Sequence, residues 1–173
     1  MQVAFASGSV QASVEELAAL TGAVGAVPAD YARFLAHVGS GRLALNEYVG
    51  ESEVAADIGV GVVYAPGDIG DPQAWWADRI PAGFIGIADS AGGNLICLSL
   101  RPQDHGTVYF WDHGLEAEDG EVADMSNMVL VAHSFAQFID ALRPVDISQV
   151  PESEGTAWVD PEFARELLDE TPQ

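Results

Sequence analysis

Ser90 stands between Asp89 and the pair Gly92-Gly93, a setting in which a serine can act as a nucleophile. Nucleophilic catalysis by serine needs a histidine base and a carboxylate within hydrogen-bond reach. The residue directly after the serine is Ala91 instead of glycine, and the only upstream histidine, His37, lies in a predicted helix. We therefore expect a hairpin turn at this point of the chain and not a catalytic loop.

The oxygen-bearing side chains of the same turn, Asp89, Ser90 and Asn94, could also bind a calcium ion. An EF-hand loop takes its oxygen ligands from positions 1, 3, 5 and 12 and is flanked by helices. Here the flanking segments are predicted strands, and the acidic ligands are too few. The sequence predicts no metal site at this turn.

Histidine and carboxylate side chains meet once more, at Asp112-His113, with His105 and His133 as further histidines. A strand rises about 3.3 Å per residue, so His105 and His113, at opposite ends of one predicted strand, would lie roughly 26 Å apart. That separation is too large for a shared metal ion, and we expect loop histidines hydrogen-bonded to the backbone. Whether His133 approaches either of them is left open.

The common motifs of enzyme sites are missing from the sequence: it has no phosphate-binding glycine loop, dinucleotide fingerprint, zinc-protease helix or hydrolase nucleophile turn. We expect no catalytic residue, no metal and no cofactor. The chain is therefore predicted not to be an enzyme, and a small hydrolase is the least favoured alternative.

The net charge of the chain limits the classes of molecule that it is expected to bind. Its 173 residues hold six arginines, no lysine and 27 acidic residues, for a formal net charge of −21, while 49% of residues are hydrophobic. Phosphate contacts and anionic membranes both need clustered Lys and Arg, so neither nucleic acid nor a membrane is an expected partner. We expect a folded acidic protein whose protein partner is basic. Adaptation to salt, or a GC-rich genome that favours arginine, would explain the composition without any partner.

Targeting signals are also missing from the sequence. The N-terminus lacks the positive segment and apolar core of a signal peptide, and no stretch approaches the ~20 apolar residues of a membrane span. Cys97 has no second cysteine with which to form an intramolecular disulfide. A cytoplasmic protein is expected.

The acidic residues concentrate in one window. From Pro102 to Leu142 there is no Lys or Arg, and the loop Gly114–Asp124 is rich in Glu and Asp. We predict that this loop contacts a partner, with three aromatic residues as candidate anchors whose alternative role is core packing. The candidate residues are Asp112, Glu116, Glu118, Asp119, Glu121, Asp124, Trp75, Trp76 and Tyr48.

Three helices are predicted from apolar spacing and capping residues. The first follows the capping box Ser13-Val14-Glu15-Glu16, presents Val14, Leu17, Ala18 and Thr21 on one face and ends at Gly22. The second begins at Pro28 and carries the stripe Tyr31, Phe34, Leu35 and Val38. The third runs from Ser134 and stops before Pro144.

Short apolar runs between the second and third helices predict strands. They are Phe84–Ala88, Leu95–Leu100, Thr107–Trp111 and Met128–Ala132, with Val60–Tyr64 and Arg42–Asn46 as weaker candidates, and a short helix at Ile69–Ile80 carrying both tryptophans. Strands in the centre with helices before and after indicate an α+β fold: one antiparallel sheet of about 4–6 strands with the helices on one side.

The chain changes character near residue 144. We expect one domain over residues 1–144 and an acidic extension over 145–173, where Asp160-Pro161-Glu162 has the features of a helix start. That helix would dock either on its own domain or on a partner.

Four segments carry a family likeness in a fixed order: Val27-Pro28-Ala29-Asp30-Tyr31-Ala32-Arg33-Phe34-Leu35, then Phe84-Ile85-Gly86-Ile87-Ala88-Asp89 with Gly92-Gly93-Asn94-Leu95-Ile96-Cys97-Leu98, then Gly106-Thr107-Val108-Tyr109-Phe110-Trp111-Asp112-His113, then Val131-Ala132-His133-Ser134-Phe135-Ala136-Gln137-Phe138. Together they resemble the SUKH superfamily, specifically its Smi/Knr branch. The chain departs from that pattern at Val38-Gly39-Ser40-Gly41, Gly93-Asn94 and Leu98-Ser99-Leu100, where the family has asparagine-glycine, glycine-aspartate and leucine-aspartate-leucine.

The Smi/Knr branch is known in bacteria as immunity proteins of polymorphic toxin systems and in yeast as a cell-wall-synthesis regulator. The resemblance implies an α+β fold, no catalysis and a protein-binding function, and it supplies no catalytic residue. The leading hypothesis is therefore an immunity protein that neutralises a cognate toxin, such as a nuclease with a basic groove. The alternative is an intracellular adaptor or regulator of the same fold with no toxin partner.

Overall fold

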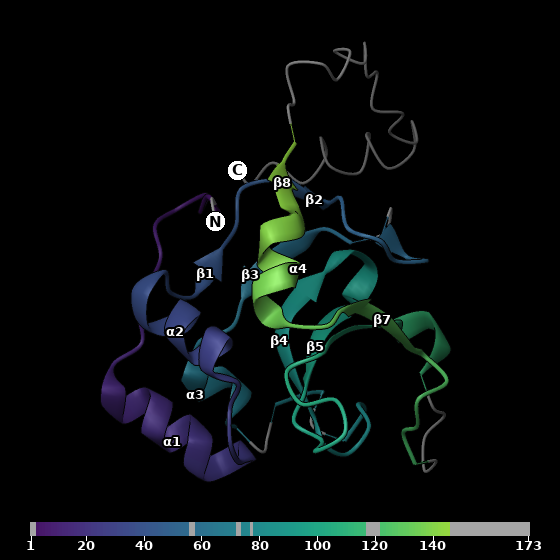
Figure 1. Cartoon of the computed structure of the whole chain (residues 1–173), viewed down its shortest axis with the longest axis horizontal. Coiled ribbons are helices and arrows are strands. Elements are labelled where there is room, and N and C mark those ends of the chain that lie inside the picture. The colour runs from purple at the N-terminus through teal and green to yellow at the C-terminus, as the bar shows by residue number, and fades with distance from the viewer. Residues whose placement is uncertain (1–2, 56–57, 72–73, 77, 117–121, 146–173) are drawn as a thin grey trace, which may run out of the picture.

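A computed structural model describes residues 3–55, 58–71, 74–76, 78–116 and 122–145 of the chain (Figure 1). Its helices are α1 (Val14–Val24), α2 (Ala29–His37), α3 (Pro66–Ile69) and α4 (Phe135–Ala141), and its two 3-10 turns are η2 (Ala91–Gly93) and η3 (His113–Leu115). The strands are β1 (Gly41–Arg42), β2 (Asn46–Tyr48), β3 (Val60–Val63), β4 (Phe84–Ser90), β5 (Leu95–Ser99), β6 (Val108–Trp111), β7 (Met128–Ala132) and β8 (Leu142–Pro144). The predicted α+β class is confirmed.

The main sheet is antiparallel throughout. Within the described residues it has six strands in the order β1-β3-β4-β5-β6-β7, so the strands from β3 to β7 form a meander of sequential neighbours. Strands β2 and β8 pair separately as a two-stranded ribbon, with Glu47 opposite Arg143. Short turns join β4 to β5 and β5 to β6, which favours antiparallel pairing of these neighbours, whereas longer segments join β3 to β4 and β6 to β7.

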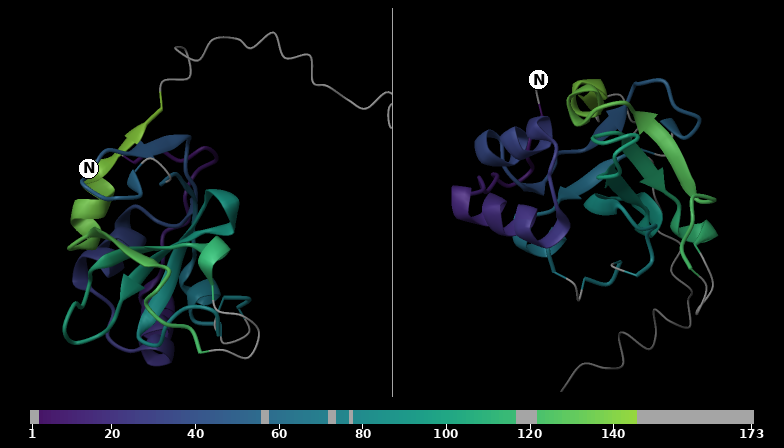
Figure 2. Two further views of the ribbon diagram at one scale, coloured as in Figure 1. Left: turned by 90° about the vertical axis from the view of Figure 1, so that its right-hand side faces the viewer. Right: turned by 60° about the horizontal axis from the view of Figure 1, so that its bottom comes forward.

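The sheet is covered on both faces, which gives two core clusters. Ile96, Leu98, Val108 and Phe110 face a cluster that also holds the buried residues of α1, α2 and α4. Their neighbours along the same strands face the opposite way, because side chains alternate along a strand. That second cluster contains Trp76, Ile80, Phe84, Leu95, Cys97, Trp111 and Met128. Figure 2 shows α1 and α2 packed side by side next to the sheet.

The predicted helix starts are largely confirmed. The Ser13 hydroxyl accepts the Glu16 N–H at 3.2 Å, and the Glu16 carboxylate accepts the Ser13 N–H at 2.8 Å, which makes a complete capping box. Pro28, the predicted start of the second helix, is the N-cap of α2, which begins one position later at Ala29. Ser134 caps α4 by accepting the Gln137 N–H at 3.1 Å.

The prediction for the inner face of the first helix is wrong. Val14 is 79% exposed, whereas Leu20 is buried, and Leu17 and Val24 pack beside it against the core. The helix also runs past Gly22 to Val24 and ends at a glycine cap. Residues 17, 20 and 24 keep the helical spacing, so the period is right and the phase is shifted.

Two further element predictions are wrong. No helix is seen in the described part of 69–80 beyond Ile69, where α3 ends, and the described residues after it form turns and bends. Pro72 disfavours a helical conformation for Asp71, which stops the helix there. The predicted strand over residues 42–46 is divided between β1 and β2, because the Asn46 side chain bonds the Val60 N–H and carbonyl in place of a continuous ladder.

The predicted helix at residues 160–162 lies outside the described part of the chain. Among the residues that the structure does describe, no helix combines the length and the apolar character needed to cross a membrane.

Candidate functional site

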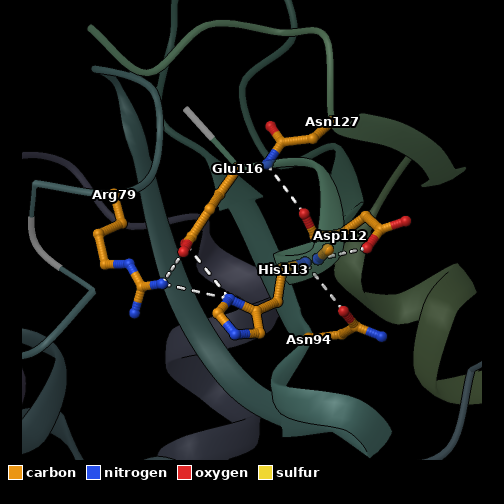
Figure 3. Close-up of polar contacts among 7 residues, drawn as sticks. Arg79, Asn94, Asp112, His113, Glu116 and Asn127 are labelled. Carbon is orange, nitrogen blue, oxygen red and sulfur yellow. Dashed lines mark hydrogen bonds and ion pairs between the residues drawn. The ribbon is translucent and has the colours of Figure 1, made fainter. Parts of the chain in front are cut away.

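The candidate site begins at η3, the 3-10 turn that follows β6 on the sheet face away from the helices. Three bonds hold this turn: Asp112 Oδ1 accepts the Gly114 N–H at 2.8 Å, Asn94 Oδ1 accepts the His113 N–H at 2.9 Å, and the Asn127 amide donates to the Asp112 carbonyl at 3.0 Å (Figure 3). Because Asn94 comes from the β4–β5 hairpin and Asn127 from the approach to β7, the turn is anchored to both of its neighbours.

Arg79, His113 and Glu116 form a polar triangle next to this turn, and Figure 3 shows the three side chains pointing toward one another. Arg79 Nη2 donates to Glu116 Oε1 and lies 3.2 Å from His113 Nδ1, and Nδ1 lies 3.3 Å from Glu116 Oε2. The side chains of Arg79 and Glu116 are 33% and 24% exposed, so the pair is shielded from water on most sides.

The three side chains cannot satisfy all of their contacts at once, whether or not His113 Nδ1 carries a proton. If His113 Nδ1 accepts from Arg79, its lone pair also faces Glu116 Oε2, and two acceptors are then in contact. If Nδ1 carries a proton, it donates to Glu116 and turns that proton toward the Arg79 cation. A ring nitrogen is a donor or an acceptor but not both, so one of these contacts is always unsatisfied.

The pKa of Glu116 reflects these opposing influences. Burial raises the pKa of this carboxyl, whereas the hydrogen bonds and the charges of Arg79 and His113 lower it, and the net pKa lies below the ordinary value. Glu116 is therefore an internal ion-pair partner in the unbound chain, a role that the sequence did not reveal.

The Trp75 side chain contacts this cluster and also reaches the protein surface. Its side chain is 51% exposed, its ring packs edge-on against Trp76 at 5.7 Å, and Trp76 stacks on Tyr64 at 4.7 Å. The Arg79 guanidinium lies 4.9 Å from the Trp75 ring centroid. Contacts with Trp76 and Arg79 therefore hold the Trp75 ring in place, while about half of its surface stays exposed to solvent.

Other apolar side chains are exposed around the same turn and the loop after it. Leu115 is 64% exposed, Val122 is 90% exposed and Met125 is 37% exposed. Three of the predicted carboxylates lie here: Asp112 in the turn, Glu116 in the triangle and Asp124, which accepts the Ser126 N–H at 2.8 Å and whose pKa is lowered by hydrogen bonds from Ser126. We call Trp75, Leu115, Val122 and Met125, with the carboxylates of Asp112, Glu116 and Asp124, the candidate surface.

The structure places the remaining predicted residues elsewhere. Tyr48 is buried, its hydroxyl donates to the Val131 carbonyl at 2.8 Å, and its ring stacks on Phe138. Trp76 is 9% exposed and belongs to the second core cluster. These two aromatics pack in the core, so Trp75 is the member of the trio that reaches the surface. Glu118, Asp119 and Glu121 lie outside the described residues.

Sequence reasoning missed Arg79, which joins Trp75 to the turn. A signal was available: arginine is rare in this chain, and this one stands four residues after Trp75 in a segment that carries two tryptophans. The exposed apolar residues Leu115 and Met125 were missed too, because neither belongs to a periodic pattern.

A second polar network lies on the same sheet face, at the turn after β5. Asp104 accepts from Arg101 Nε at 3.0 Å, from the Ser99 hydroxyl at 2.7 Å and from the Tyr109 hydroxyl at 2.8 Å. The Arg101 guanidinium also lies over the Phe84 ring at 4.4 Å. The hydrogen bond from Arg101, with those from Ser99 and Tyr109, outweighs burial and lowers the pKa of Asp104 to about 2. This network joins the turn to the sheet.

The residues weighed for catalysis or metal binding have structural partners. The Ser90 hydroxyl donates to the Gly59 carbonyl at 2.9 Å, and Asp89 accepts the Val62 N–H. His105 Nε2 lies 2.9 Å from the Ala26 carbonyl, the backbone contact expected for a loop histidine. In the described part of the chain, no group of three or more His, Cys, Asp or Glu side chains is arranged to hold a metal ion.

Comparison with known proteins identifies the family. The profile of the SMI1 / KNR4 family (SUKH-1) matches residues 11–141, a span that begins just before α1 and ends with α4. The chain is also similar to the SPbeta prophage-derived uncharacterized protein YokK of Bacillus subtilis (strain 168), with 35% identity over 85 residues, 49% of this chain and 40% of that relative. The chain therefore spans well under half the length of the relative. Because the family match covers most of the chain and the whole six-stranded sheet, the chain belongs to the SMI1 / KNR4 family (SUKH-1).

Proposed function

We propose that this protein is an immunity protein that binds a cognate toxin domain and blocks it. Membership of a family known for toxin immunity supports this proposal, and the prophage origin of a relative is in keeping with it. The printed name of that relative assigns it no activity, so the proposal depends on the surface of this chain.

The half-exposed Trp75 is the observation that carries the proposal. Binding hot spots are rich in tryptophan, and they work best when the ring is already held in its bound orientation, because little rotamer entropy is then lost. Trp76 and Arg79 hold Trp75 in this way. Leu115 and Met125 are exposed as well, and the Met125 sulfur accepts from Arg101 Nη1 at 3.3 Å.

Charge indicates the kind of partner. No Lys or Arg occurs between residues 102 and 142, and both Asp124 and Asp78, which precedes Arg79 in the sequence, are exposed. A basic surface, such as the substrate groove of a nuclease toxin, would be attracted to the candidate surface and would complement it once docked. The same charge disfavours nucleic acid itself as a ligand.

The test is neutralisation of the toxin encoded next to this gene. We expect W75A to weaken the affinity for that toxin at least tenfold, or ~1.4 kcal/mol, because the partner loses a packed aromatic anchor. V14A is the matched control, since Val14 is 79% exposed on α1 and far from the candidate surface in the chain. Both affinities are measured by titration calorimetry, and both variants are assayed for protection of cells.

Two results would contradict the proposal. If W75A binds and protects as well as the parent, the surface is misassigned. If no neighbouring gene encodes a toxin and the chain captures cellular enzymes instead, the adaptor role replaces immunity.

A further inference from the structure

The Arg79 guanidinium has three different kinds of neighbour. It lies 4.9 Å from the Trp75 ring centroid and 5.8 Å from that of Trp111, it donates to Glu116, and it lies 3.2 Å from His113 Nδ1. Aromatic faces and a shielded carboxylate are the groups that hold guanidinium ions in proteins. The arrangement therefore has the composition of a guanidinium-binding site, with Arg79 as its present occupant.

The walls of this site are better anchored than its occupant. Trp111 is a fully buried residue of β6, and His113 and Glu116 belong to or adjoin the turn that Asn94 and Asn127 hold in place. Arg79 instead comes from a segment of turns and is one-third exposed. Its side chain can leave without breaking a strand or a helix.

Arg79 does not use the full capacity of Glu116. One nitrogen of Arg79 reaches one carboxylate oxygen, Oε1. The other oxygen, Oε2, is buried and lies 3.3 Å from His113 Nδ1, and no Arg79 nitrogen makes a hydrogen bond to it. A guanidinium and a carboxylate pair most strongly through two parallel N–H···O bonds. An arginine that approached Glu116 head-on would therefore be a better ligand than Arg79.

We propose that Trp75, Trp111, His113 and Glu116 form a guanidinium-binding site that Arg79 fills in the unbound chain, and that an arginine of the protein partner takes its place in the complex. The second half rests on the proposed function, and the first half does not.

Chemical rescue of the isolated full-length chain tests the site. In R79A the cation is removed, and we expect the lost thermal stability to return when methylguanidinium occupies the vacated position. A ligand at several times its Kd raises Tm by about 2–4 °C in a domain of this size. About 10 mM of the ion suffices and is far below the molar concentrations at which guanidinium denatures proteins.

Three controls make the rescue specific. R79A/E116Q lacks the carboxylate and should show no rescue, and methylammonium, which lacks the planar fork, should stabilise R79A less than methylguanidinium does. R33A removes an exposed arginine of α2 and should not respond to either ion. If R79A does not fold, R79Q, which keeps most of the aliphatic stem, carries the same measurement.

The outcomes separate the two halves of the proposal. A methylguanidinium shift no larger in R79A than in R79A/E116Q overturns the binding site. If the site is confirmed, methylguanidinium should weaken toxin binding to R79A, because the ion and the partner's arginine would compete for one position, and a toxin affinity that does not depend on the ion overturns the exchange. If no toxin binds the parent chain, the proposed function fails while the rescue result stands.

Discussion

Tyr31 belongs to one of the four segments that carry the family likeness, and its side chain is fully buried. Its ring packs edge-on against Phe135 at 4.8 Å, and no described residue accepts a hydrogen bond from its hydroxyl. Burial raises the pKa of this hydroxyl. The ring therefore contributes packing, and the hydroxyl contributes an unpaired buried dipole.

The contrast between the packed ring and the unpaired hydroxyl of Tyr31 gives a prediction for removal of the hydroxyl oxygen alone. We expect Y31F to raise the free energy of unfolding by about 1 kcal/mol, because it removes a buried polar group without a partner. The matched control is Y48F, which should lower it by about 1 kcal/mol, since the Tyr48 hydroxyl donates to Val131. Urea denaturation measures both. A larger loss in Y31F than in Y48F would contradict the assignment.

Asp104 gives a prediction about acid stability. Hydrogen bonds from Arg101, Ser99 and Tyr109 lower its pKa to about 2 from an ordinary 3.8. A lowered carboxyl pKa stabilises the fold above the unfolded-state value, and this contribution is lost as pH falls from about 4 toward 2. We expect the parent to lose on the order of 2 kcal/mol of unfolding free energy across that window through this group.

The variant D104N isolates this contribution. Its unfolding free energy should be lower than that of the parent at pH 7, and the difference should shrink as pH falls through the window. Thermal melts from pH 7 to pH 2 measure it. If the difference between the two proteins is independent of pH, the ion pair with Arg101 does not stabilise the fold.

At the scale of elements, the β4–β5 hairpin positions the candidate surface. Gly93 has φ of +83° and faces His113 so closely that an added Cβ would lie 3.1 Å from the ring carbon Cδ2. Asn94, the next residue, accepts the His113 N–H. The family has aspartate at this position of the motif, and a carboxylate oxygen could accept the same bond, so the departure to asparagine keeps the anchor.

We therefore expect G93A to disturb both the hairpin and the site. A non-glycine residue at this φ costs about 1–3 kcal/mol, and its methyl group would displace the His113 ring, whose Nδ1 contacts Arg79 and Glu116. The control G22A lies in α1 with open space around it and should stabilise the helix by about 0.5–1 kcal/mol. Denaturation measures the change in stability, and the NMR shifts of the His113 ring report any change in its position. Unchanged His113 shifts in a destabilised G93A would show that the contact does not position the ring.

Elements with local signals were predicted well. The capping box at Ser13 and the cap at Ser134 act within one turn of chain, so their partners are present in the sequence itself. The segment after α3 was predicted incorrectly because its described residues form turns, which have no periodic signal in the sequence. Its place is fixed by Trp76 packing into the second core cluster, a contact between distant parts of the chain.

At the scale of the molecule, the carboxylates are spread widely. Exposed acidic residues occur on α1, β2, the loop after β2 and α3 as well as on the candidate surface; they include Glu15, Glu47, Glu51, Glu53, Asp68 and Asp124. Acidic residues that are spread over many elements are consistent with solubility or salt adaptation as well as with binding. The aromatic and apolar groups, and not the charge, mark the site, while the whole field steers a basic partner.

The loop charges provide the prediction at this scale. Reversal of Glu118, Asp119, Glu121 and Asp124 to lysine should slow toxin association about tenfold at low salt and leave dissociation nearly unchanged, because long-range charge attraction acts mainly on encounter. The control reverses Glu15, Glu47, Glu51 and Glu53, which gives the same change in net charge. Stopped-flow association rates at several salt concentrations measure the effect. Equal slowing by both sets would show that net charge alone steers the partner.

The sequence by itself determined the period of the elements, the helix starts, the antiparallel meander and the family, because these depend on alternation, capping and segment order along the chain. The tertiary structure decided which of three aromatics reaches the surface, and it showed that Asp112 and Glu116 have internal partners. It also decided that Arg79 meets Glu116 across 37 positions of sequence. Burial and ion pairing depend on distance in space, and local patterns do not contain that distance.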